Sequence, residues 1–448
     1  MGVDQAVAAA GRPGLSKRLP ALSQSHALRC GVFFLLYVRQ GLPAGFAATA
    51  LANSLTARGV APEVVGGFVA LTGLPWTLQF VWGPVIDRFQ GSAMGRRRPW
   101  ILGAQLLGVA AILPLLAVVD PAAELSVVAW TFLVHAVFAS VQDTGVDALA
   151  VSVVPDRERG RTNAFMRAGF IAGMGAGAGL SVVMAAYGFR AAAALQTLAL
   201  ALLAVLTFVV RERPGDALLP GRPRLDPDGH GPGHAGRTTG AIALELARGL
   251  IAPASLRLFP AIAGGYLAAS VFIRALSIHL VRDAGWGDVE MSALSGGAGT
   301  AMALAVVAVG GWLSDRVGHQ RLLCWVLLAL AAYLLGFAAL GPWWSSRSLT
   351  RPALVVWYAF DPLLSVAAMP ALMALCRPGV EGSQFTAYMA LVNLCDVLGS
   401  YLAGQALGVA SAPTLAAACG LVVLLAGVAT VGRPHRDPPA PPTIEPPA

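Results

Sequence analysis

Residues 73–98 read GLPWTLQFVWGPVIDRFQGSAMGRRR, an apolar run that ends in GPVIDR at 83–88 and is followed by a cluster of three arginines. A helix that leaves an apolar medium is expected to stop on charged residues at the interface. A second copy, GWLSDR at 311–316, lies 228 residues further on and is followed by Arg321. Two such stops half a chain apart predict a membrane-embedded protein built by duplication.

The composition supports a membrane as the solvent for this chain. Its 448 residues are 56% hydrophobic and only 12% charged, with a mean hydropathy of +0.69, whereas a soluble domain is typically about 25% charged. The net charge of +8 does not indicate nucleic-acid binding, because the arginines lie in short loops between apolar segments.

Twelve apolar segments are long enough to cross a bilayer, which takes roughly 20 residues each. The predicted fold is therefore all-α and integral to the membrane, with twelve helices in two six-helix bundles. The predicted helices are 28–50, 63–87, 100–119, 125–154, 162–187, 190–210, 257–281, 288–314, 320–340, 351–375, 384–407 and 412–431.

Five regions follow from these segments. The predicted bundles are 28–210 and 257–431. A cytoplasmic segment (1–27) precedes them, without the pattern of a cleaved signal peptide. A Pro- and Gly-rich linker (211–256) joins them, ending in a stretch that favours a short interfacial helix, and a Pro-rich tail (432–448) is predicted to be disordered.

The distribution of basic residues predicts the orientation. With a cytoplasmic N-terminus, 23 of the 31 Lys and Arg residues fall on the cytoplasmic side, five fall outside and three lie within helices. Positive charge is retained in the cytoplasm, so both termini are expected there, in a multi-pass protein of the inner (plasma) membrane.

A second motif repeats between the halves. ERGRTNAFM at 158–166 and EGSQFTAYM at 381–389 share the pattern E-x5-A-[F/Y]-M at an offset of 223 residues. Two motifs that repeat at nearly one offset predict internal symmetry, which many transporters have, with a substrate site between the halves near the midplane.

The two Gly-x-x-x-Asp-Arg stops resemble the loop motif of the major facilitator superfamily. That resemblance implies a cytoplasmic gate that breaks and reforms during alternating access. It assigns to the gate one set of residues from each half: Asp87, Arg88 and Arg96, and Asp315, Arg316 and Arg321. The loop after Arg88 is longer than usual, which leaves the partner of each arginine open. The alternative is that both motifs are only topogenic anchors.

The same resemblance implies that helices 1, 4, 7 and 10 line a central cavity. Ionisable residues inside a bilayer are costly and mark pathways more often than structure. On these four helices the candidates for the substrate and proton pathway are Arg39, Gln40, Asp143, Asp147, Arg274 and Asp361, with Gln142 and His279 as secondary candidates. The other secondary candidates, for which a structural salt bridge is favoured, are Arg167 on helix 5 and Asp396 on helix 11.

Asp143 and Asp147 are the most informative of these candidates. Four residues apart, they share one helical face, and two neighbouring carboxylates disfavour double ionisation, as a reversible proton site requires. Arg39 and Arg274 could pair with them or hold an anionic substrate. The alternative is that all these groups form fixed ion pairs that lock the bundle.

Other motifs say less about function. The glycine run at 173–179 contains a dinucleotide-like fingerprint, but it lies mid-helix and favours close helix packing through Gly173/Gly177 and Gly175/Gly179. The Gly-Leu-Pro sequences at 41–43 and 73–75 are expected to break their helices. The five cysteines and the histidines of the linker indicate no metal site, and no cofactor is expected.

A narrower resemblance concerns GLPWTLQFVWGPVIDR, GRRRPW at 95–100 and QDTGVDA at 142–148. Together these are similar to the AmpG-like branch, which includes muropeptide permeases, acetyl-CoA transporters and siderophore importers of the RhtX/FptX type. Tyr37-Val-Arg-Gln-Gly-Leu-Pro favours the siderophore type. The resemblance implies import of a large polar solute, commonly by proton symport.

The predicted function is therefore that of a non-enzymatic secondary transporter, a proton-coupled importer of a siderophore or muropeptide-like solute. The expected partners are that solute, protons and the lipid bilayer, with no nucleic acid and a monomeric state. An efflux permease of the same fold is the first alternative. A membrane sensor or assembly factor is the second alternative. Such a protein is expected to have few ionisable residues on the helices that line the cavity, whereas this chain has several.

Overall fold

A computed structural model describes residues 21–88, 92–155, 158–221, 239–376 and 381–430. It contains twelve helical spans that are long and apolar enough to cross a membrane, which confirms the predicted fold. The first span is α1 (His26–Gly45), a π-helical turn (Phe46–Leu51) and α2 (Ala52–Ala57). The next five are α3 (Pro62–Thr77) with its 3-10 extension (Gln79–Val81), α5 (Arg98–Ile112) with its 3-10 extension (Leu113–Leu116), α6 (Leu125–Val153), α7 (Arg159–Tyr187) and α8 (Phe189–Val209).

The second six spans follow a short helix, α9 (Thr239–Leu250). They are α10 (Pro253–Arg282), α11 (Asp288–Leu294) continued by a π-helical turn (Ser295–Gly299) and α12 (Thr300–Val317), α13 (His319–Ala339), α14 (Arg347–Trp357) with α15 (Phe360–Met373), α16 (Glu381–Ala406) and α17 (Ala412–Thr430). The helix predicted at the end of the linker is thus present as α9. The centre of the predicted linker (222–238), the tail and the first 20 residues lie outside the described residues.

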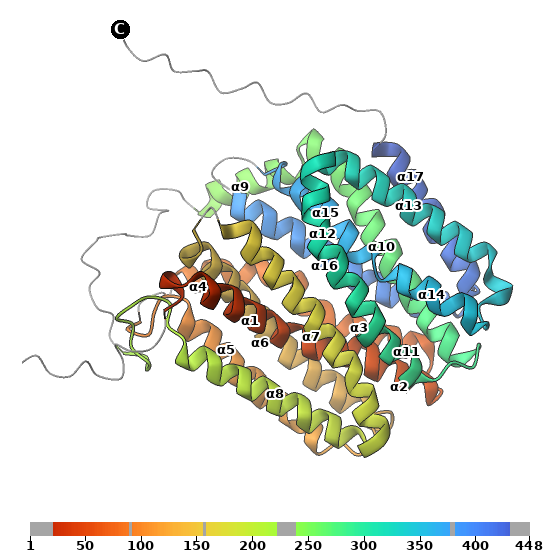
Figure 1. Ribbon diagram of the computed structural model, residues 1–448, viewed down its shortest axis with the longest axis horizontal. Coiled ribbons are helices and arrows are strands. Elements are labelled where there is room, and N and C mark those ends of the chain that lie inside the picture. Colours follow the sequence, from red (N-terminus) through yellow and green to blue (C-terminus); the bar gives the residue numbers. More distant parts are fainter. Residues whose placement is uncertain (1–20, 89–91, 156–157, 222–238, 377–380, 431–448) are drawn as a thin grey trace, which may run out of the picture.

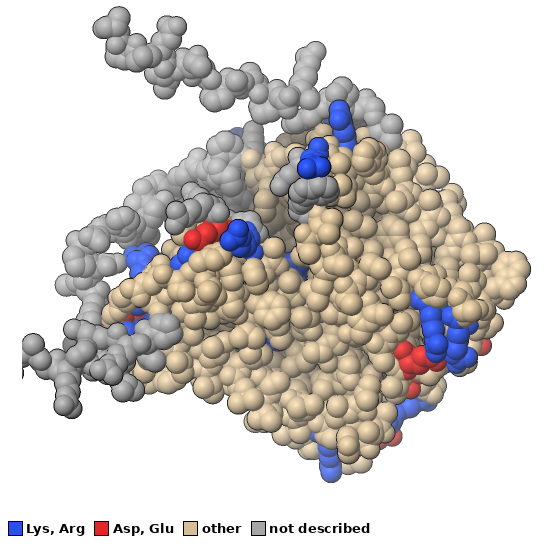
Figure 2. Space-filling view, viewed as in Figure 1, with Lys and Arg blue, Asp and Glu red and all other residues tan. Residues whose placement is uncertain are grey.

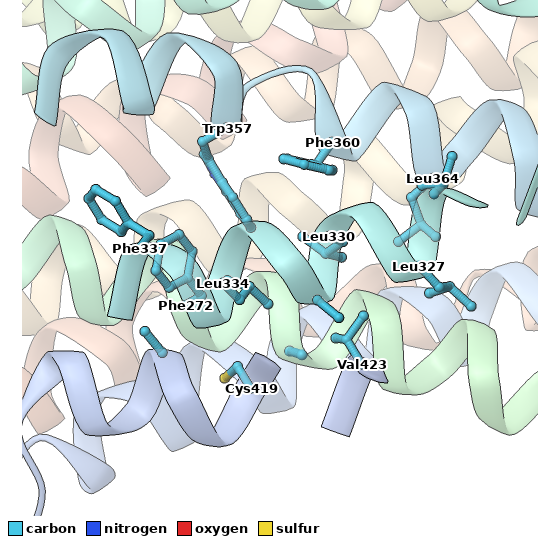
Figure 3. Packing of buried hydrophobic residues seen from close by; sticks show 14 of the residues in the cluster. Phe272, Leu327, Leu330, Leu334, Phe337, Trp357, Phe360, Leu364, Cys419 and Val423 are labelled. Atoms are coloured by element: carbon cyan, nitrogen blue, oxygen red, sulfur yellow. The ribbon is translucent and has the colours of Figure 1, made fainter. Parts of the chain in front are cut away.

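The helices divide into two bundles by chain order. Figure 1 shows α1 to α8, in red to yellow-green, on one side and α10 to α17, in green to blue, on the other. Each bundle has its own apolar core. In the second one, Phe272 packs against Trp357 with ring centroids 4.6 Å apart, and Leu330, Leu334 and Val423 fill the space between helices (Figure 3).

An even number of spans places the start of α1 and the end of α17 on the same side of the membrane. We call this the terminal face and the opposite one the distal face. Figure 2 shows the visible charged side chains gathered toward opposite edges of the molecule, with a broad uncharged band between them. Such a band is what the hydrocarbon core of a bilayer requires of the surface that it contacts.

Small residues allow the two bundles and their helices to approach closely. A Cβ atom on Gly173 would lie 2.3 Å from the Val38 carbonyl oxygen of α1, and one on Gly177 would lie 2.1 Å from that of Leu42. A Cβ on Gly175 would lie 2.1 Å from Oγ1 of Thr300 in the other bundle. Gly173, Gly175 and Gly177 therefore form a packing surface, as predicted, between α7 and its neighbours α1 and α12. The prediction is not confirmed for Gly179, whose Cβ position has nothing within 4 Å.

Several spans are interrupted at membrane depth. The break predicted at Pro43 is not present, because the first span continues through Pro43 into a π-helical turn that begins three residues later. The break predicted at Pro75 is present, since α3 ends at Thr77, two residues after this proline. The tenth span also breaks, between Trp357 and Phe360, where no break was predicted. This last break puts Asp361 in the first turn of α15, where the helix dipole favours a carboxylate.

One loop at the terminal face is held by a carboxylate and an arginine. The Glu212 carboxylate accepts backbone N–H bonds from Arg96 (3.1 Å), Arg97 (2.7 Å) and Arg98. The Arg98 guanidinium in turn donates to the Met94, Thr207, Ala217 and Phe208 carbonyls. Burial raises the pKa of Glu212, against the three N–H bonds that lower it. These hydrogen bonds of Glu212 and Arg98 join the start of α5 to the end of α8.

Gly95 makes this loop possible, and its replacement by alanine tests it. Its φ of +115° is left-handed, and a Cβ there would lie 2.7 Å from the Glu212 carboxyl carbon. Because the backbone strain alone is about 1–2 kcal/mol, Gly95→Ala is expected to lower the thermal stability of the detergent-solubilised protein. Gly103→Ala is the matched control, since Gly103 lies within α5 and has open space around its Cβ position. Equal melting temperatures for the two variants would contradict this account.

Candidate functional site

Two carboxylates of α6 and a tyrosine of α1 form the centre of the candidate site. The Tyr37 hydroxyl donates to Oδ1 of Asp147 at 2.5 Å. The Asp143 carboxylate lies beside Asp147, the Tyr37 hydroxyl and the Gln40 amide. Within the described part of the chain, neither aspartate forms an ion pair with an arginine. Two carboxylates one turn apart and without a counter-ion favour uptake of a proton or a cation.

The helical period explains which residues of α1 reach this cluster. Tyr37 and Gln40 are three residues apart and share a face of α1, whereas Arg39 is turned about 100° from Gln40. Gln40 is buried, and its Nε2 has no hydrogen-bond partner. Tyr37 was not among the sequence candidates. Its spacing from Gln40 is the signal that could have found it.

Arg39 lies inside the first bundle rather than at the carboxylates. It is 2% exposed, and it donates through Nη1 to Oε1 of Gln142, through Nη2 to the Gln105 carbonyl (2.8 Å) and through Nε to the Leu200 carbonyl (3.4 Å). The structure thus brings Arg39 together with Gln142 and joins four helices of the bundle through neutral oxygens. It does not bring Arg39 to Asp143 or Asp147.

An ion pair within the spans connects the two bundles. Nη2 of Arg167, on α7, lies 2.6 Å from Oδ2 of Asp361, on α15. The Arg167 guanidinium also lies 5.8 Å from the centroid of the Phe170 ring. Tyr266 of α10 lies close enough to interact electrostatically with both charged groups. The salt bridge expected for Arg167 is present, and its partner is one of the principal sequence candidates.

The other second-half candidates lie apart from this pair. Nη1 of Arg274 donates to the Ala48 carbonyl of the first bundle, and Asp396 is an electrostatic neighbour of Arg274. His279 lies near the distal end of α10, where its Nδ1 is 2.9 Å from Oδ2 of Asp283. His279 is therefore outside the central cluster.

Buried hydrogen bonds join the bundles at the distal face. Nδ2 of Asn53, at the end of the first span, donates to Oγ of Ser292 at 2.9 Å. Its Oδ1 accepts from Oγ of Ser277 at 2.6 Å. All three residues are buried, whereas Asp147 and Asp361 nearer the centre are exposed. We call Asn53, Ser277 and Ser292 the distal seal, a cluster that sequence reasoning did not identify.

The predicted gate at the terminal face is described only in part. The side chains of Asp87, Arg88 and Asp315 lie outside the described residues. Arg316 and Arg321 are exposed, and the Arg96 backbone is bound to Glu212. The gate therefore stays a prediction.

A separate cluster at the terminal face involves Glu158, the first residue of the repeated E-x5-A-[F/Y]-M motif. Oε2 of Glu158 is 2.8 Å from Nδ1 of His26 and accepts from Nε (3.0 Å) and Nη2 (2.5 Å) of Arg29. These bonds to His26 and Arg29 lower the pKa of Glu158. The motif thus ties the start of α7 to the start of α1.

Comparison with known proteins decides the family. The model of the Major Facilitator Superfamily matches residues 30–400. The chain belongs to this superfamily. A solved structure described as a POT family transporter in complex with a thioalcohol-conjugated peptide has the same fold, with a TM-score of 0.61 over 89% of this chain and 94% of that one, at 14% identity.

Two curated relatives share part of the sequence. An uncharacterized protein of Haemophilus influenzae is 35% identical over 153 residues, and the anhydromuropeptide permease of Escherichia coli K12 is 30% identical over 157 residues. These matches cover 33% and 35% of this chain. The chain aligns with only about a third of each relative's length, 34% and 32%. The identity to a named permease supports the AmpG-like resemblance.

The distal seal can be tested with Asn53→Ala. The substitution removes two bonds between the bundles, each worth about 0.5–1.5 kcal/mol, so the population with an open distal face is expected to rise. Spin labels on cysteines at Ala57 and Asp288, in a chain without its five native cysteines, would report this as a longer distance between α2 and α11. Thr56→Ala is the matched control, because Thr56 is equally buried but bonds only within its own helix, to the Ala52 carbonyl. Indistinguishable distance distributions for Asn53→Ala and the parent would refute the seal.

Proposed function

We propose that this chain is a proton-coupled importer of a bulky polar solute of the muropeptide type, working by alternating access. The observation that carries the proposal is the pair Asp143 and Asp147, which lie on one face of α6, bonded to Tyr37 and without an arginine partner in the described chain. Membership of a transporter superfamily makes a permeation pathway the natural setting for such a pair.

In this proposal the two carboxylates take up and release the coupling proton. One neutral and one charged aspartate is the arrangement that two adjacent carboxyl groups favour in a poorly hydrated site. The Tyr37 hydroxyl connects the carboxylates of α6 to the first span. A change of charge at Asp147 would thereby reach the π-helical turn and the distal seal that follow on the same span.

The proposed direction of transport depends on which face of the protein lies in the cytoplasm. The excess of arginines on the terminal face supports a cytoplasmic position for that face, by the positive-inside rule. Exposed central carboxylates under a closed distal seal then correspond to a cytoplasm-facing state. The residues Asp87, Arg88 and Arg96 with Asp315, Arg316 and Arg321 would form the opposing gate, which closes when the distal seal opens.

The solute class rests on the likeness to the anhydromuropeptide permease and on the motifs shared with the AmpG-like branch. A ferric siderophore is the other solute of that branch that the Tyr37 to Pro43 stretch favours. Both solutes are large and polar, so both need the wide cavity between two rocking bundles.

Uptake in cells that lack the gene tests the proposal. Cells expressing the chain are expected to accumulate radiolabelled anhydromuropeptide, and a protonophore should abolish the accumulation. Asp143→Asn and Asp147→Asn are each expected to reduce gradient-driven accumulation at least tenfold, while exchange of labelled for unlabelled solute persists, because exchange needs no net proton movement.

Asp120→Asn is the control for these variants. Asp120 is also an aspartate in an ordered contact, 2.6 Å from Nη1 of Arg58, but it lies at the distal surface. Uptake that is insensitive to the protonophore, or unchanged in both central variants, would refute proton coupling at this pair. The same uptake measurement with a ferric siderophore decides between the two solutes.

A further inference from the structure

The five buried or half-buried arginines within the spans fall into two groups according to how completely the guanidinium is bonded. Arg39 and Arg29 each use Nε, Nη1 and Nη2 as donors, and so does Arg98 at the start of α5. A guanidinium has five N–H donors, and a buried donor without an acceptor costs about 1–3 kcal/mol. These three arginines are therefore structural, since the protein itself supplies acceptors for every nitrogen.

Arg167 and Arg274 belong to the other group, and both lie where the bundles meet. In the described chain Arg167 bonds through Nη2 alone and Arg274 through Nη1 alone, and Nε of each is buried without a partner. Arg167 is the one of the two that pairs with a carboxylate. That pairing is single, Nη2 to Oδ2, although an arginine and a carboxylate favour two parallel bonds.

The exposure of the pair sets it apart from a fixed ion pair. The side chains of Arg167 and Asp361 are 33% and 62% exposed, whereas those of Arg29 and Glu158 are 5% and 14% exposed. Asp361 is thus exposed on one side. If it separated from Arg167, its carboxylate would therefore not be left in an apolar environment. The first turn of α15 also stabilises its charge there.

We propose that Arg167 is the receptor for a carboxylate group of the transported solute, and that Asp361 occupies this position in the empty protein. The solute carboxylate replaces Asp361 on the guanidinium and supplies the second parallel bond that the present pair lacks. The Phe170 ring covers one face of the Arg167 guanidinium. The N–H edge of the guanidinium is therefore the part that stays available to the solute carboxylate. This inference rests on the proposed function and specifies its solute as a carboxylate-bearing anion.

Replacement of Asp361 also has a structural consequence. The present pair joins α7 of the first bundle to α15 of the second, and a solute bound to Arg167 removes that connection. Occupation of the site therefore frees the bundles to move relative to each other, so the solute itself promotes the next step of alternating access.

The experiment compares one solute in two charge forms. The probes are anhydromuropeptide with free carboxylates and the same molecule with its carboxylates converted to amides, and the KM for uptake is measured for each. The parent is expected to prefer the acid by about ten- to hundredfold, the range of one charge-assisted pair. Arg167→Gln should abolish that preference, Arg167→Lys should restore part of it, and Asp361→Asn should increase it, because the competing carboxylate is gone.

A fixed latch between the bundles predicts a different pattern. Loss of either partner would then change uptake of the acid and of the amide by the same factor, and the ratio of their KM values would not move. That outcome, or a parent without preference for the acid, overturns the inference and leaves the proposed transport intact. If the parent takes up neither form, the proposed muropeptide transport fails and this inference fails with it.

The matched control is Arg58→Gln. Arg58 and Asp120 form a pair with the same 2.6 Å contact, but at the distal surface. Its loss should leave the acid-to-amide ratio at the parent value. A shift of that ratio in Arg58→Gln as large as the shift in Arg167→Gln would show that the effect is not specific to the site, and would overturn the inference.

Discussion

Charge inside a bilayer must be stabilised by the protein, and this constraint orders the whole structure. A charged side chain at membrane depth costs about 2.5–3.5 kcal/mol even on the mildest scales. Arg39 meets that cost with three neutral oxygens drawn from three neighbouring helices. The first bundle is held around this contact. Four groups are less completely bonded, and these form the candidate site: Asp143, Asp147, Arg167 and Asp361.

The same constraint limits where a helix can be interrupted. An interrupted helix leaves backbone groups without partners, which is tolerated at membrane depth only next to other helices or a hydrated cavity. The π-helical turn of the first span and the break of the tenth lie next to residues of the candidate site. The first span carries Tyr37 before its π-helical turn and Asn53 after it, and the tenth places Asp361 at the start of α15. The first span thus carries both Tyr37 of the candidate site and Asn53 of the distal seal.

Much of the fold follows from local patterns in the chain. Twelve runs of apolar residues, two Gly-x-x-x-Asp-Arg stops and a repeated E-x5-A-[F/Y]-M motif were enough to predict twelve spans in two bundles, because a bilayer admits few alternatives to helices. The prediction that Gly173, Gly175 and Gly177 serve close packing is also confirmed. The break in the tenth span was missed, although Pro362 could have indicated it, because a proline cannot donate a hydrogen bond to the carbonyl of Tyr358 four residues earlier.

The candidate site was predictable as a set of residues but not as a set of contacts. Hydrophobic length and the cost of buried charge are properties of the sequence alone, so the sequence by itself determined the spans, the symmetry and the short list of intramembrane charges. Which charges meet depends on helix rotation and on packing between segments more than a hundred residues apart. Only the tertiary structure decided that Arg39 turns into its own bundle, that Arg167 reaches Asp361 across the interface, and that Asn53 joins the bundles at the distal face. Rotation of a helix by one residue changes the direction of a side chain by about 100°, and the packing that selects this rotation is not encoded in any single segment.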